Sequence, residues 1–126
     1  MKKNYIVKQV KIPEAEKDYP NLYNWNGAVK KSSAWAAKMD MMHFSHDDEF
    51  NIKHLKQYKD CYEVQASDLE DVFRITNLWD DPDAVFTINP GHSTSVGDII
   101  VDKSTGDHFV VCDFGFKLLG ITGVAA

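Results

Sequence analysis

The sequence feature that most constrains the fold is a pair of apolar segments near the end of the chain, joined by a polar turn. Residues 99–102 are rich in β-branched Ile and Val, which favour extended strands. Residues 109–112 read Phe-Val-Val-Cys, and the intervening residues 103–107 include Gly106, which suits a tight turn. We therefore predict an antiparallel β-hairpin. Neither segment alternates apolar and polar side chains, so we expect both of its faces to be at least partly covered.

A polar segment, residues 92–98, leads into this hairpin and carries the candidate functional motif. Gly97 is expected to take a backbone angle that other residues resist. Asp98 is expected to accept hydrogen bonds from backbone N–H groups of the same turn. We predict that this turn is structural and that function lies on nearby exposed loops. The candidate residues of the motif, structural or interacting, are His92, Ser93, Ser95, Gly97, Asp98, Gly115 and Phe116.

The motif also carries a family resemblance. Ser93-x-Ser95-Val96-Gly97-Asp98-Ile99, followed by a strand pair and then Gly115-Phe116, resembles the YodL-like domain of small proteins from bacteriophages, marine phages especially, and mobile elements. Residues 68–77 resemble the helix that precedes the motif in those phage proteins. The resemblance covers about residues 62–119 and implies a small α+β domain of phage or mobile-element origin. It implies no catalytic residues, and residues 1–60 show no such resemblance.

The remaining segments predict further strands and helices. Residues 4–12 and 61–66 alternate as strands do, with Tyr5, Val7 and Gln9 on one face of the first. Residues 28–44 are rich in Ala, Lys and Met and predict one helix, and residues 48–59 predict a shorter one. The capping box Ser67-x-x-Glu70 predicts a helix that starts at residue 68. Residues 84–88 suit a short strand, and the tail after residue 119 is expected to fray.

Residues 14–27 contain Pro20 and several aromatic residues, and we expect a loop that these aromatics pin over the edge of the core. The alternative is an aromatic recognition surface, because Tyr and Trp are enriched at binding hot spots. Together the segments predict a single α+β domain over residues 1–126. It should contain a small, curved, mostly antiparallel sheet of four to five strands with two or three packed helices.

Three arrangements of polar residues bear on catalysis or metal binding. His43, His46, Asp47 and His54 are residue types that bind zinc, iron or manganese. Because Ser45 or Asp47 fits the cap of a following helix better, we predict that these residues bind no common ion, and we expect no cofactor.

His92 beside Ser93 and Ser95 suggests a Ser-His pair, but short polar residues after Pro-Gly more often form a loop. Asp98, Asp102 and Lys103 lack the spacing of a nuclease site.

The charge distribution argues against binding to nucleic acid. The net charge is −5, and residues 63–83 contain seven acids against the single Arg74. An acidic surface repels phosphate, so this segment is expected to be a solvated face, or alternatively a patch that meets a basic host protein.

Hydropathy and cysteine content bear on location. No apolar run is long enough to span a membrane or to serve as a signal peptide, so we expect no membrane association. The expected location is the cytoplasm, that of the host cell if the protein is phage-encoded. In such a reducing compartment Cys61 and Cys112 are expected to be buried thiols.

Three classes of function follow from these observations. We favour a small phage or mobile-element accessory protein that acts by binding a host or phage protein. The first alternative is a nucleic-acid or nucleotide binding module, because a Val-Gly-Asp turn into a strand resembles a feature of PUA- and ASCH-like domains. The second is a metal-dependent enzyme that uses the histidine cluster. No nucleophile elbow, P-loop or dinucleotide fingerprint is present, so we do not favour an enzyme.

Overall fold

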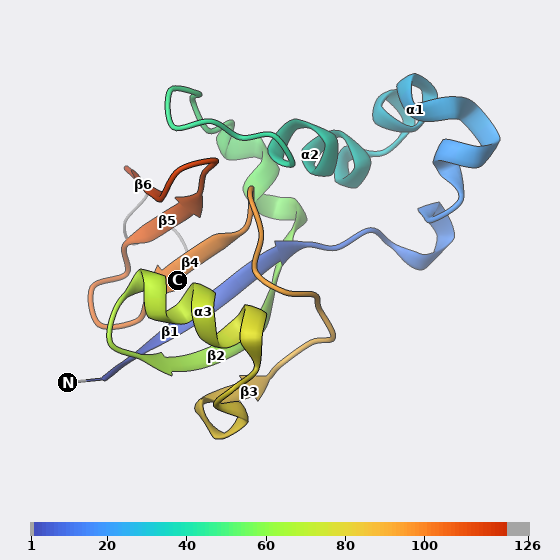
Figure 1. Ribbon diagram of the computed structural model, residues 1–126. Helices are drawn as coiled ribbons and strands as arrows, with labels where there is room; N and C mark the ends of the chain where they lie inside the picture. Colours follow the sequence, from blue (N-terminus) through green and yellow to red (C-terminus); the bar gives the residue numbers. More distant parts are fainter. Residues whose placement is uncertain (1, 121–126) are drawn as a thin grey trace.

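The computed structural model describes residues 2–120, and this part of the chain forms one six-stranded antiparallel sheet in the order β3-β2-β1-β4-β5-β6 (Figure 1). The strands are β1 (Lys3–Val10), β2 (Tyr58–Ala66), β3 (Val85–Thr87), β4 (Ile99–Asp102), β5 (His108–Val111) and β6 (Phe116–Leu119). The α-helices are α1 (Tyr19–Lys31), α2 (Ser33–Met41) and α3 (Leu69–Leu78), and three short 3-10 helices are η1 (Glu14–Glu16), η2 (Ile52–Gln57) and η3 (Pro82–Ala84). The α+β prediction is confirmed, with one strand more than we expected.

The predicted hairpin is present. β4 has the predicted bounds, and β5 begins one residue early, at His108. Ile99 lies opposite Val110 and Ile100 opposite Phe109 in antiparallel register. All four residues of β4 are buried, which confirms that both faces of the hairpin are covered.

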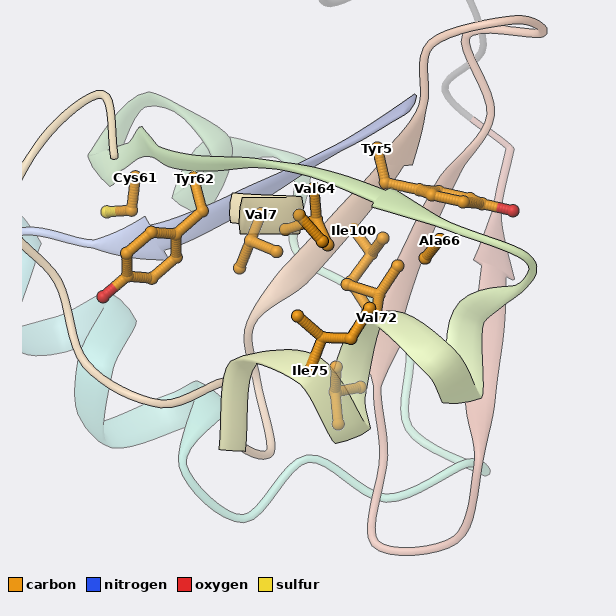
Figure 2. Packing of buried hydrophobic residues seen from close by; sticks show 11 residues of the cluster. Tyr5, Val7, Cys61, Tyr62, Val64, Ala66, Val72, Ile75 and Ile100 are labelled. Carbon is orange, nitrogen blue, oxygen red and sulfur yellow. The ribbon is translucent and has the colours of Figure 1, made fainter. Parts of the chain in front are cut away.

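Each face of the sheet has its own hydrophobic core. On one face, Val72 and Ile75 of α3 point at Val7, Val64 and Ile100 of the central strands (Figure 2). Burial of each such side chain stabilises the fold by roughly 1.5–3 kcal/mol. On the other face, the end of α2 and the segment after it cover β4 and β5; the residues buried there include Met41, Phe44, Ile99, Val101 and Val110. The sheet is therefore the middle layer of the molecule.

The N-terminal half contains two wrong predictions. Residues 28–44 do not form one helix, because Ser32 is extended (φ −134°, ψ 120°) and its hydroxyl accepts a hydrogen bond from Trp35 N–H as the cap of α2. Residues 14–27 are not a loop, since they form η1 and most of α1, with Pro20 in its first turn. A proline is tolerated there because the first N–H groups of a helix have no partner within it.

Three smaller differences concern caps and ends. The helix predicted over residues 48–59 is only η2, and its cap is Asn51, whose side chain accepts from Lys53 N–H, rather than Ser45 or Asp47. The helix predicted from residue 68 is α3, but its cap is Asp68, which accepts from Asp71 N–H at 2.8 Å, so Glu70 takes no part. The tail after residue 119 lies, from residue 121 on, outside the described residues.

Candidate functional site

The buried amide of Gln9 is the centre of a polar cluster where β1 meets the segment before β4. Its Nε2 donates to the Asp98 carboxylate at 2.9 Å and to the His92 carbonyl oxygen at 2.8 Å. Its Oε1 accepts from His92 N–H at 3.1 Å. The side chain is wholly buried and hydrogen-bonded at both ends. We did not predict this role. The sequence signals only that Gln9 is the polar member of a strand face that otherwise carries Tyr5 and Val7, and it does not indicate the partners.

Asp98 is the buried acid of this cluster. Its Oδ2 accepts from Ser95 N–H at 3.0 Å as well as from Gln9, which confirms the predicted bond to the backbone of the turn. Within residues 2–120, Oδ1 receives no hydrogen bond. Burial raises the pKa of Asp98 to about 6, and this outweighs the opposite effects of the Ser95 N–H, His92 and Gln9.

Gly97 is required at its position by both angle and space. Its φ is +92°, which confirms the predicted unusual angle. A Cβ atom there would lie 2.3 Å from the carbonyl oxygen of Met41, at the end of α2. The Tyr58 hydroxyl donates to the Gly97 carbonyl oxygen, and Gly97 N–H donates to Val111. The turn is therefore fixed against α2, β2 and β5 at once.

His92 and Ser95 do not form a nucleophile pair. His92 Nδ1 lies 2.7 Å from the Ser93 carbonyl oxygen, which only accepts, so Nδ1 carries the proton. Ser95 Oγ lies 3.5 Å from this nitrogen and donates instead to Ser93, at 3.1 Å. A protonated Nδ1 accepts nothing from Ser95, and the arrangement holds the turn rather than activating a hydroxyl.

A cavity of about 410 Å³ opens beside this turn. It is lined by Val10, Lys38, Met41, Met42, His92, Ser95, Val96, Gly97 and Asp98. A second cavity of about 440 Å³ shares Val10, Lys38 and His92 with the first, and its lining adds Lys11 and Lys17. The two cavities adjoin and have a lysine, Lys38, at their common border.

Gly115 and Phe116 lie elsewhere. Gly115 belongs to the turn between β5 and β6, and Phe116 is the first residue of β6. Both line a separate cavity of about 420 Å³ together with Phe73 and Arg74 of α3. The structure therefore brings His92, Ser95, Gly97 and Asp98 to one site and places the last two motif residues at another, while Ser93 enters the first site through its carbonyl oxygen.

The structure does not bring the residues of the predicted weak metal cluster together. His54 Nε2 lies 2.8 Å from the Asp40 carboxylate, and His46 N–H donates to Asp113 at 3.3 Å. His43 and Asp47 are exposed. Across residues 2–120, no three His, Cys, Asp or Glu side chains are placed to hold a metal ion.

α1 presents a second candidate site, which we call the aromatic arm: Leu22, Tyr23 and Trp25. Figure 1 shows α1 set apart from the sheet, with α2 between them. The exposed fractions are 67% for Leu22, 41% for Tyr23 and 55% for Trp25, although these are large apolar side chains.

The aromatic arm is held in a defined shape. Trp25 packs edge-on against Trp35 of α2, with ring centroids 5.7 Å apart. Trp35 in turn donates from Nε1 to the Glu16 carbonyl oxygen at 2.7 Å. Between the two aromatics, Asn24 has φ +57°, and its side chain accepts from Gly27 N–H at 2.9 Å and so caps the second part of α1. Asn24 thus turns the helix between Tyr23 and Trp25.

The acidic segment 63–83 is partly neutralised within the chain. Four of its seven acids lie in ion pairs: Glu63 with Lys103, Asp71 and Asp80 with Arg74, and Asp81 with Lys2. Asp68 serves as the cap of α3. These surface ion pairs reduce the negative electrostatic potential that would attract a basic partner protein. The segment is therefore a weaker candidate for a binding surface than the aromatic arm.

No family model matches the chain, and neither does any curated protein or solved structure. The resemblance of residues 62–119 to the YodL-like domain stays a prediction. Within residues 2–120, no helix combines the length and the apolar character needed to cross a membrane. Both cysteines are buried free thiols, as predicted.

Proposed function

We propose that this chain acts by binding another protein and that the aromatic arm is the contact surface. The observation that carries the proposal is the exposure of Leu22, Tyr23 and Trp25 together on one helix. The resemblance of residues 62–119 supports the rest of the proposal, which is that the chain is a phage or mobile-element accessory protein in the cytoplasm of its host.

The physical argument concerns the free energy of exposed apolar surface. A Trp and a Leu in water forgo roughly 1.5–3 kcal/mol each that burial would contribute. Folding leaves them exposed and still orders them, through Asn24 and through the contact between Trp25 and Trp35. Tyr and Trp have few rotatable bonds, so a pre-ordered pair loses little entropy on binding. Those properties are typical of the side chains that dominate protein interfaces.

The charges beside the aromatic arm indicate the kind of partner. Lys30 and Lys31 occupy the last turn of α1 and are exposed, and the Lys31 ammonium lies 4.7 Å from the centre of the Tyr23 ring. A complementary surface would offer an apolar groove with carboxylates at its rim. Such carboxylates would pair with these lysines and speed the encounter.

The test is capture from bacterial cells that express the tagged chain, followed by mass spectrometry. We expect the parent to retain a protein at near-equal stoichiometry and the Trp25→Ala and Leu22→Ser variants to lose it. Phe114→Ser is the matched control, because Phe114 is 84% exposed but lies between β5 and β6. Circular dichroism should show all variants folded.

Two results would contradict the proposal. One is capture of the same proteins by the parent and by Trp25→Ala, which would place the contact elsewhere. The other is a parent that dimerises in solution and becomes monomeric on Trp25→Ala, which would show that the aromatic arm joins two copies of this chain.

A further inference from the structure

The cavity beside Asp98 has an inner end that accepts hydrogen bonds. Asp98 is 6% exposed, and the two side-chain and backbone donors that hold it both go to Oδ2. Oδ1 is left with unused acceptor capacity, and Asp98 is one of the residues that line the cavity. The last turn of α2 ends at the same place, and the negative end of a helix dipole favours a donor group. This end of the cavity therefore suits a ligand that offers N–H groups.

The walls of the cavity are apolar and adaptable. Val10 and Val96 line it together with Met41 and Met42. Thioether and branched aliphatic side chains make good contacts with the flat face of a ring, and Met adjusts its shape to what it touches. The volume of about 410 Å³ falls within the range of about 300–1,000 Å³ that small-molecule sites occupy.

The border that the two cavities share is basic. Lys38 and His92 line both cavities, and Lys11, Lys17 and Glu14 line the second one. Lys17 is paired with Glu14 at 3.1 Å, and Lys11 donates to the Pro90 carbonyl oxygen. The ammonium of Lys38 takes part in no hydrogen bond or ion pair within residues 2–120. It is thus the cation best placed to meet an anionic group of a ligand.

These three parts in sequence, an acceptor at the inner end, apolar walls and a basic rim, match a mononucleotide. We propose that the two adjoining cavities bind a purine nucleoside monophosphate, with its base donating to Asp98 Oδ1 and its phosphate near Lys38 and His92. Guanine fits best, since its ring N–H and its amino group lie side by side, whereas the single N–H of uracil is flanked by two carbonyl oxygens that a carboxylate repels. This site is separate from the aromatic arm.

A ligand that matches only the Asp98 end of the site, or only its lysine end, does not fit the whole site. A free phosphate would meet the rim but would gain nothing from Asp98, whose charge repels it. A simple organic cation would suit Asp98 but would be repelled by Lys38 and Lys11. A ligand with donors at one end and an anion at the other satisfies both ends. A long nucleic acid is disfavoured by the net charge of −5.

Isothermal titration calorimetry on the full chain tests the site with four probes: GMP, UMP, guanosine and inorganic phosphate. We expect GMP to bind in the micromolar to millimolar range and each of the other three to bind about tenfold or more weakly. No binding of GMP at millimolar concentration would overturn the proposal. Equal binding of GMP and phosphate would do so too, because it would leave an anion site only.

Variants assign the two ends. Lys38→Ala should weaken GMP binding about tenfold and leave guanosine unchanged, while the control Lys53→Ala, an exposed lysine that lines neither cavity, should change neither. Asp98→Asn should remove the preference for GMP over UMP. A variant Asp98→Asn that keeps the preference for GMP, or unchanged GMP binding in Lys38→Ala, refutes the assignment.

Discussion

Replacing Asp98 by Asn should make the protein more stable at neutral and alkaline pH. Asn keeps the shape of the side chain, and its amide oxygen takes the place of Oδ2, which accepts from Gln9 at 2.9 Å and from Ser95 N–H at 3.0 Å. The amide nitrogen takes the place of Oδ1, for which the described residues provide no hydrogen-bond donor. The substitution therefore removes a buried charge and retains the hydrogen bonds.

The size of the effect follows from the pKa of Asp98, which burial raises from its ordinary value of 3.8 to about 6. Each pH unit of such a difference corresponds to roughly 1.4 kcal/mol, so the ionised carboxylate destabilises the native state by about 3 kcal/mol above pH 6. The folded protein binds the proton more tightly than the unfolded chain does. Stability attributable to Asp98 therefore rises as pH falls through 6 and levels off below about pH 3.8.

Guanidinium denaturation at several pH values measures this. At pH 8 we expect the free energy of unfolding of Asp98→Asn to exceed that of the parent by about 3 kcal/mol. In a thermal melt, each kcal/mol corresponds to a rise of roughly 3–5 °C in Tm for a chain of this size. The advantage should shrink by roughly 1.4 kcal/mol between pH 8 and pH 5. Other acids, such as Asp71, whose pKa the Ser67 N–H lowers, titrate alike in both proteins, so the difference isolates Asp98.

Asp98→Ala is the matched comparison. It removes the same charge but leaves the Ser95 N–H and one Gln9 N–H unpaired, at about 1–3 kcal/mol each. It should be less stable than Asp98→Asn at every pH, by an amount that does not vary with pH. Two results would refute the reasoning about burial. One is an Asp98→Asn variant that is no more stable than the parent at pH 8. The other is a stability difference between Asp98→Asn and the parent that is the same at pH 8 and pH 5.

Two further predictions concern glycine and cysteine. Gly97→Ala should lower Tm more than Gly115→Ala as measured by thermal unfolding: both have positive φ, but a Cβ at Gly97 meets the backbone of Met41, whereas one at Gly115 meets nothing within 4 Å. An equal fall in Tm for the two variants would show that the positive φ accounts for the loss and that the contact with Met41 does not. Cys61 and Cys112 are buried, and burial raises the pKa of each thiol, so iodoacetamide should label them slowly in the native protein and rapidly in guanidinium. Fast native labelling would contradict their burial.

The parts of the fold that were predicted depend on local signals. The hairpin of β4 and β5 is marked by β-branched residues around a glycine turn, and α3 by the polar capping residues at its start. Gly97 and Asp98 act within a four-residue turn, so their conformation and bonding also followed from their neighbours.

The parts that were missed depend on distant or single contacts. The donors of Gln9 reach His92 and Asp98, which are 83 and 89 positions away along the chain, and nothing in the neighbourhood of Gln9 indicates that meeting. The break at Ser32 was missed because its neighbours are good helix formers, and one hydroxyl that caps Trp35 N–H overrides them. The turn at Asn24 has the same origin in a single side chain.

The strand order also has a consequence for how the chain folds as it is made. β1 leaves the ribosome well before β4, yet the two strands are neighbours in the middle of the sheet, and Val7 must wait for Ile100 to pair on that side. At about 5–20 residues per second, translation leaves that edge of β1 open for roughly 5–20 s. During that interval the sheet can add β2 beside β1 but not β4, so the nascent chain holds an unfinished sheet whose unpaired edge is open to pairing with another chain.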